Sequence, residues 1–201
     1  HETAAHNQRV GFACADACYL PFKEKAFDST FCVAMLQHIR EVETAVKEFA
    51  RVTRVGGRIM VVEPDNGARY WYSSTPAGRR VFEMSSTFFS PLSTARREAT
   101  EAAVGPKLPT LFASCGVEPL DVRLFPVSQT RLGPPPSEVW ERRHEVVEQL
   151  IDQAPNEDVR VLGRAYLAAL DAYAAEARTA GSAFVEIQHT MLFATVGQRV
   201  E

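Results

Sequence analysis

The sequence has little of what marks a membrane-embedded, secreted or nucleic-acid-binding protein. No apolar run approaches the roughly 20 residues that a membrane-spanning helix needs. The first ten residues, HETAAHNQRV, lack the apolar core of a signal peptide. Lys and Arg number 22 against 25 Asp and Glu, a net charge of −3, so the chain carries no excess of basic residues for nucleic acid. We therefore expect neither a nucleic-acid partner nor membrane insertion.

Cysteine is also scarce and is not arranged for a metal. The four cysteines (Cys14, Cys18, Cys32 and Cys115) lack the paired spacing of a zinc site. His1 and His6 are five residues apart, whereas the helical two-histidine zinc motif needs four. Three of the cysteines have apolar neighbours, which favours reduced, buried thiols. We expect no metal site and a reduced, cytoplasmic protein.

The apolar residues of the first 65 positions alternate between two patterns. Short apolar runs at 9–15, 29–35 and 58–62 predict buried strands. Residues 41–53 carry apolar side chains at helical spacing, and Gly56-Gly57 is predicted to end that helix. Strands that alternate with helices imply crossover connections and a largely parallel sheet. The pattern predicts an α/β fold.

The remaining two thirds of the chain mix helices with two further strands. Residues 66–106 show a loose pattern of short helices and loops. A helix is predicted at 107–114 and a strand at 118–125. After the prolines at 134–136, Ser137 is predicted to cap one helix and Asn156 to precede another that Gly181 stops. A last strand is predicted at 183–196.

Six features in order carry a family resemblance. Asp16 closes an apolar run, Leu20-Pro21-Phe22 follows, and Phe27-Asp28 opens the next run. A helix, Gly56-Gly57 and a strand that ends in acid complete the set. This order resembles the middle of a class I S-adenosylmethionine-dependent methyltransferase of the small-molecule, quinone-biosynthesis-like type.

The resemblance implies a fold and a domain plan. The fold is α/β, a Rossmann-like methyltransferase sheet that is mostly parallel with an antiparallel final strand, plus helical elaboration. Residues 1–201 form one methyltransferase domain, in which 66–106 and 127–182 elaborate the substrate pocket. The implied activity is methyl transfer from S-adenosylmethionine to a small organic acceptor.

The resemblance also assigns four residues to the site. The Asp16 carboxylate would accept a hydrogen bond from the adenine amino group, and the Ala17 N–H would meet a ring nitrogen. Val33 would contact the methionine end of the cofactor, and His38 would act as a general base. The structural alternatives are that Asp16 only begins a turn, Val33 only packs in the core and His38 only bonds its neighbours.

Two further groups stay open between site and structure. Glu63 and Asp65, at the end of a predicted strand, would polarise a substrate or be solvated loop acids. The aromatic run Tyr70-Trp71-Tyr72 would line an acceptor pocket or pack between helices.

One element of the family pattern is missing from the sequence. The glycine-rich turn that follows the family's first strand has no counterpart, since the first glycine is Gly11. Together with His1 as first residue, this leads us to expect a truncated chain that lacks about two βαβ units of about 30 residues each and is inactive alone. The alternative is a non-catalytic methyltransferase-like module. A dehydrogenase fits less well, because its fingerprint is also absent.

Overall fold

The computed structural model describes residues 11–95 and 103–200. In chain order its elements are β1 (Phe27–Val33), η2 (Leu36–His38), α1 (Val42–Val52), β2 (Thr53–Ser73), α2 (Pro76–Ala95), α3 (Val104–Ser114), β3 (Val117–Leu132), α4 (Ser137–Asp152), α5 (Glu157–Ala180), η3 (Gly181–Ala183) and β4 (Val185–Arg199). Within these two ranges, no helix combines the length and apolarity that crossing a membrane requires.

The four strands form one mixed sheet in the order β1-β2-β4-β3. β1 runs parallel to β2, with Phe31 opposite Met60. β4 is antiparallel to both β2 and β3. The α/β class and the antiparallel final strand are confirmed, and the parallel pairing of 29–35 with 58–62 is confirmed as well.

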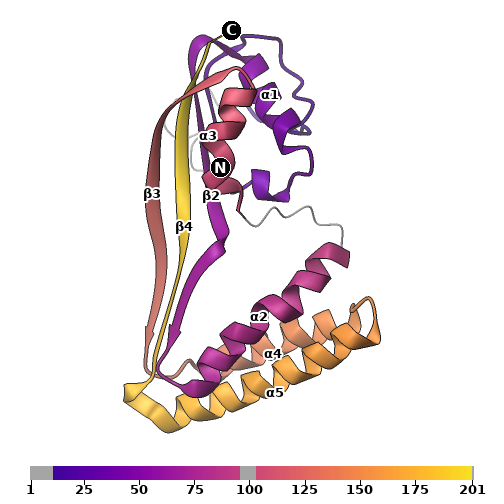
Figure 1. The fold of residues 1–201 in the computed structure, drawn as a ribbon, viewed down its shortest axis with the longest axis vertical. Coiled ribbons are helices and arrows are strands. Elements are labelled where there is room, and N and C mark those ends of the chain that lie inside the picture. The colour runs from indigo at the N-terminus through magenta and orange to yellow at the C-terminus, as the bar shows by residue number, and fades with distance from the viewer. Residues whose placement is uncertain (1–10, 96–102, 201) are drawn as a thin grey trace.

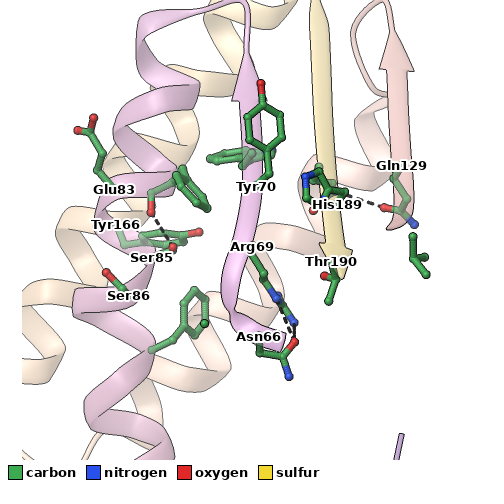
Figure 2. A pocket seen from close by; sticks show the side chains of 16 residues that line it. Asn66, Arg69, Tyr70, Glu83, Ser85, Ser86, Gln129, Tyr166, His189 and Thr190 are labelled. Atoms are coloured by element: carbon green, nitrogen blue, oxygen red, sulfur yellow. Dashed lines mark hydrogen bonds between the residues drawn. The ribbon is translucent and has the colours of Figure 1, made fainter. Parts of the chain in front are cut away.

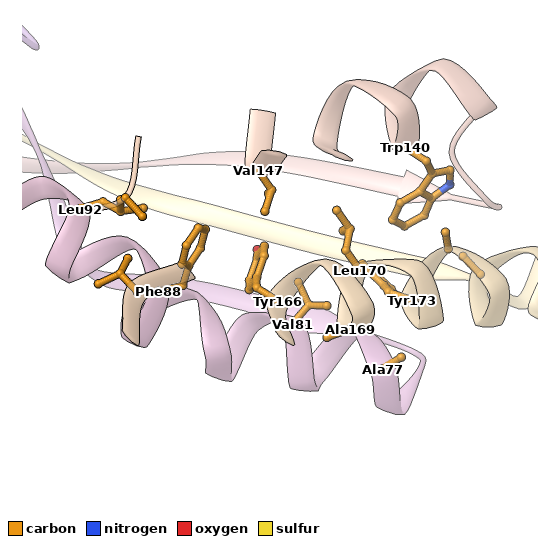
Figure 3. Close-up of a cluster of buried hydrophobic side chains, with 14 of the residues drawn as sticks. Ala77, Val81, Phe88, Leu92, Trp140, Val147, Tyr166, Ala169, Leu170 and Tyr173 are labelled. Carbon is orange, nitrogen blue, oxygen red and sulfur yellow. The ribbon is translucent and has the colours of Figure 1, made fainter. Parts of the chain in front are cut away.

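The strands are long enough to join two groups of helices (Figure 1). α1 and α3 lie against one end of the sheet, and α2, α4 and α5 lie at the other end. Each group has its own apolar core. The first contains Leu36, Val46, Ile59, Leu108 and Phe112, and the second, drawn in Figure 3, contains Phe88, Trp140, Tyr166, Tyr173 and Phe184.

Local sequence explains α1 and α5. The buried side chains of α1, among them Val46 and Phe49, recur at the predicted helical spacing. α5 begins where the Asn156 side chain accepts a hydrogen bond from the Val159 N–H at 3.0 Å. The cap predicted for α4 is wrong, because Pro136 takes the N-cap position and makes no side-chain cap bond.

The predicted boundaries fail where strands depend on distant partners. β2 continues eleven residues beyond the predicted end at Val62, because it pairs with β4 as far as Ser73 opposite Glu186. The region 66–106, predicted as short helices and loops, instead contains this extension and the 20-residue helix α2. Likewise β3 extends to Leu132, beyond the predicted end at 125, because it pairs with β4 throughout.

Two other predictions near the start of the chain are also wrong. Residues 11–15 of the predicted first strand form no strand, and residues 9 and 10 lie outside the described part. α1 ends at Val52, so Gly56-Gly57 belongs to β2. Gly56 has a φ of +73°, and a Cβ on Gly57 would lie 2.6 Å from the Asp28 carbonyl oxygen. The two glycines therefore let the backbone turn sharply near the start of β2 and pass close to β1.

The face of the sheet that α1 and α3 leave open is partly apolar. Phe31 is 77% exposed and Val33 is 56% exposed on β1, and Met60 is 38% exposed on β2. Cys32, Ile59 and Val61 alternate with them and are buried.

Candidate functional site

A buried carboxylate organises the loop that follows β1. Glu63 lies on β2 one residue beyond the pair Val33–Val62, and its side chain is fully buried. Its Oε1 accepts the backbone N–H groups of Met35 at 2.8 Å and Leu36 at 2.7 Å. Its Oε2 accepts the N–H of Gln37 at 3.3 Å. Glu63 is therefore a positioning residue, and the alternative of a solvated loop acid is wrong.

Cys32 lies under this loop. Its Sγ is 3.9 Å from Glu63 Oε1. Burial, reinforced by the Glu63 charge, raises the pKa of the Cys32 thiol to about 11. Cys32 is thus a protonated, inert thiol. All four cysteines are free, and Cys14 alone among them is exposed.

The Asp16–Ala17 segment forms a tight turn. Asp16 Oδ1 accepts the Cys18 N–H at 2.8 Å, and the Asp16 carbonyl accepts the Tyr19 N–H at 3.0 Å. The turn role is therefore present, and it occupies one carboxylate oxygen. Asp16 is exposed, and the structure shows no hydrogen bond to its Oδ2 from the described residues.

The fold brings the predicted residues to one end of the sheet. Val33 ends β1, and the loop held by Glu63 leads directly to His38, which is exposed. Cys18, from the Asp16 turn, approaches the carbonyl of Glu41 at 3.8 Å, just before α1. Ala17 packs against the same apolar core as Leu36. The turn and the strand-end loop therefore flank the start of α1.

Asp65 is also structural, and its neighbour Asn66 links two regions. Asp65 Oδ1 accepts the N–H groups of Gly67 and Ala68 at 2.9 and 3.1 Å, which shapes the bulge in β2. Asn66 Nδ2 donates to Gln37 Oε1 at 2.8 Å, and Arg69 donates to Asn66 Oδ1 at 2.7 Å. A polar chain thus runs from the strand-end loop to the bulge, where Figure 2 shows Asn66 and Arg69.

The bulge borders a cavity of about 790 Å³, called here the first cavity. It lies between the extended strands and α2 (Figure 2). Aromatic side chains form much of its wall, and amides, hydroxyls and a histidine supply polar groups; those used below are Asn66, Tyr70, Trp71, Phe89, Tyr166, Gln188 and His189. Trp71 lines this cavity and also packs edge-on against Tyr173 of α5, with a ring-centroid distance of 5.8 Å, so the packing role is present.

His189, which the sequence did not indicate, lies in the wall of the first cavity. Its ring stacks on Tyr70 at a centroid distance of 5.2 Å. Its buried Nδ1 has no hydrogen-bond partner among the described residues. His189 stands between the polar residues Gln188 and Thr190 of the closing strand, so nothing in the sequence singled it out.

A second cavity of about 720 Å³ lies between α4, α5 and the same strands. On its wall the fully buried Glu186 accepts two hydrogen bonds from Arg143, at 2.8 and 3.2 Å. It also accepts one from the Tyr173 hydroxyl at 2.7 Å. Burial raises the pKa of Tyr173 well above its usual range, which keeps this hydroxyl a donor.

The N-terminal segment has recognisable relatives. Residues 1–61 match the family model of a methyltransferase domain. Demethylmenaquinone methyltransferase of Mycobacterium marinum (strain ATCC BAA-535 / M) is 38% identical over 60 residues, which are 30% of this chain and 26% of the relative. Methyltransferase GfsG of Streptomyces halstedii is 34% identical over 55 residues, which are 27% of this chain and 20% of the relative. The aligned part thus spans about a quarter or less of these relatives' length.

Solved structures extend the likeness to the whole chain at the level of fold. A candidate methyltransferase of Bacillus halodurans C-125 aligns with a TM-score of 0.54 at 14% identity, over 99% of this chain and 75% of that chain. The YcgJ protein of Bacillus subtilis aligns with a TM-score of 0.52 at 17% identity, over 98% and 74%. Residues 1–61 are therefore similar to a methyltransferase domain, and the chain as a whole shares the Rossmann-like fold of these solved structures.

Proposed function

We propose that this chain acts in methyl transfer from S-adenosylmethionine to a small organic acceptor. The observation that carries the proposal is the buried Glu63, which holds three N–H groups of the loop after β1. In open α/β sheets, ligands bind beyond the carboxyl ends of the strands, and this loop lies there. Through Gln37 and Asn66 the loop adjoins the first cavity. A cofactor position and an acceptor position are therefore neighbours.

The residues at the strand end fit the cofactor. Asp16 keeps Oδ2 as an acceptor, and the structure shows no hydrogen bond from the adjacent Ala17 N–H to the described residues. An acceptor beside a donor matches the polar edge of adenine. Val33, more than half exposed, offers an apolar surface. The bound cofactor supplies a sulfonium methyl that is already activated, so the protein's main tasks are proximity and orientation.

These contacts alone support weak binding. Two polar groups and one apolar side chain offset only part of the several kcal/mol of freedom lost on binding. We therefore expect the 201 residues by themselves to bind S-adenosylmethionine weakly and to show no transfer.

The first cavity is the proposed acceptor site. Its aromatic wall suits a flat apolar ring, and its amides and hydroxyls suit ring oxygens. The names of relatives that methylate demethylmenaquinone agree with a ring acceptor. His38, exposed at the end of the loop, is the proposed base where the acceptor must lose a proton. With its four free cysteines, the protein is proposed to work in the reducing cytoplasm.

The proposal is tested by the cofactor affinity of Asp16 variants in the full-length protein. Asp16→Ala should weaken binding by roughly 1.5–3 kcal/mol, the value of a hydrogen bond to a charged group. Asp16→Asn retains an acceptor for the Cys18 N–H, so it separates loss of charge from loss of the turn. Asp121→Ala, an exposed acid on β3, is the control.

Calorimetry measures these affinities, and transfer of labelled methyl measures activity. Unchanged affinity in Asp16→Ala would reduce Asp16 to a turn residue. Tight cofactor binding with no transfer to any ring acceptor would favour the non-catalytic module instead.

A further inference from the structure

The second cavity concentrates arginine side chains against an apolar wall. Arg131 reaches it from β3, and Arg142 and Arg143 reach it from α4. Val147 and Leu170, both buried, belong to the same wall. Cations beside apolar surface are the two halves of a site for an anionic, otherwise apolar ligand.

Arg143 is already committed to the protein. Both of its terminal nitrogens donate to Glu186, and its guanidinium lies 4.8 Å from the centre of the Trp140 ring. An arginine cluster can have a purely structural role, which is to neutralise a buried carboxylate. Here Arg143 alone already gives Glu186 two hydrogen bonds.

In the described part of the chain, neither of the other two arginines donates a hydrogen bond to Glu186, although Arg131 forms an ion pair with it. Arg131 is 3.5 Å from Glu186 Oε1, and its buried Nε has no hydrogen-bond partner in the described part of the chain. Arg142 is exposed, and no ion pair joins it to any acid within residues 11–95 and 103–200. The cavity lining holds three arginines against Glu138 and Glu186, so 3 − 2 leaves one net positive charge.

The two cavities adjoin and share part of their lining. Both are bounded by Trp71, Phe89, Tyr166 and Gln188. An elongated ligand that enters the first cavity from the strand-end loop would therefore reach Arg131 and Arg142 along an aromatic wall.

We propose that the second cavity binds the carboxylate or phosphate end of an apolar ligand through Arg131 and Arg142. Where the proposed methyl transfer holds, this ligand is the acceptor, with its methylated end in the first cavity and its anionic end in the second. The substrate class is then an amphipathic ring compound that carries one terminal anion. The identity of the ligand as acceptor depends on the proposed function, whereas the anion site itself does not.

Direct binding without cofactor tests the site. The probes are 2-naphthoate, 2-naphthyl phosphate and the neutral 2-naphthamide, titrated into the protein by calorimetry. At least one anion should bind about tenfold or more tightly than the amide, and this preference should shrink as salt rises. A preference for phosphate over carboxylate, or the reverse, would name the anion.

Matched variants locate the binding. Arg142→Gln should lower affinity for the anion about tenfold and leave the amide unchanged, and Arg131→Gln should do the same. Arg131→Lys, which keeps the charge, should retain part of the affinity. Arg80→Gln, an exposed arginine of α2 that lines neither cavity, should change nothing. Because Arg142 is exposed, its variant should fold normally, as circular dichroism can check.

Equal affinity for anions and amide, or anion affinity that survives Arg142→Gln and Arg131→Gln, would overturn the proposal. This readout is independent of methyl transfer. Loss of S-adenosylmethionine binding in Asp16→Ala addresses the proposed function only, and loss of naphthoate binding in Arg142→Gln addresses the anion site only.

Discussion

The Leu36 N–H lies 2.7 Å from Glu63 Oε1, although 27 residues separate them in sequence. Through this bond and its two neighbours, β2 determines the course of the loop that leaves β1. Gln37, whose N–H donates to Glu63, in turn accepts a hydrogen bond from Asn66. The buried Glu63 therefore links the end of the parallel strands to the first cavity.

Glu63→Gln should destabilise the protein by roughly 1.5–3 kcal/mol, because the loop N–H groups lose a charged acceptor and the new amide donor faces one of them. Urea unfolding measures the free energy. Glu118→Gln, exposed on β3, is the control and should stay within about 0.5 kcal/mol of the parent. A parent-like Glu63→Gln would mean that the loop is held by other contacts.

The Gln37–Asn66 bond should couple the loop to the first cavity. A double-mutant cycle with Gln37→Ala and Asn66→Ala should give a coupling of about 0.5–1.5 kcal/mol in stability. Additive effects of the two substitutions would show that the side chains act separately.

Cys32 should make stability fall at alkaline pH. Its folded pKa of about 11 lies above the ordinary thiol value of 9.0. The folded state therefore holds the proton more tightly, so its stabilising effect is complete below about pH 9 and is lost as pH rises toward 11. Unfolding of the parent and of Cys32→Ala across this window checks the sign, since the variant should lose less stability.

Thiol labelling offers an independent measurement of the same group. At pH 8 a thiol with this pKa is ionised to only about 0.1%, and the thiolate is the reactive form. Cys14, which is exposed, should react first with a disulfide reagent, and Cys32 should react only on unfolding. Rapid labelling of Cys32 in the folded protein would contradict the buried position.

Glu186 should be among the most costly side chains to remove. Glu186→Ala leaves the Arg143 guanidinium and the Tyr173 hydroxyl without their buried acceptor, so we expect a loss of about 3–5 kcal/mol. Tyr173→Phe removes one hydrogen bond and should cost only about 1 kcal/mol. Urea unfolding compares the two, and equal costs would contradict the central role of Glu186.

His38→Ala tests the proposed base. In the full-length protein it should lower the rate of methyl transfer about 100-fold or more to an acceptor that must lose a proton, with cofactor affinity unchanged. His144→Ala, a histidine on α4 that lines neither cavity, is the control. An unchanged rate would remove His38 from catalysis and direct attention to His189, whose Nδ1 is unpartnered within the described chain.

The sequence by itself determined the elements whose causes are local. The apolar stripe of α1, the Asn156 cap of α5 and the apolar run of β1 each depend on side chains a few residues apart, so periodicity and capping sufficed. The ordered motifs around Asp16 and Phe27-Asp28 likewise indicated the methyltransferase domain whose family model matches residues 1–61.

Only the tertiary structure decided what depends on distant partners. β2 could not be seen to reach Ser73, because that extension exists through hydrogen bonds with β4, more than 100 residues away. The role of Glu63 depends on N–H groups that another strand's loop presents to it. The arginines of the second cavity come from β3 and α4, and His189 comes from β4. The spacing of residues along the chain does not reveal such contacts, because only long-range packing determines which side chains line the same cavity.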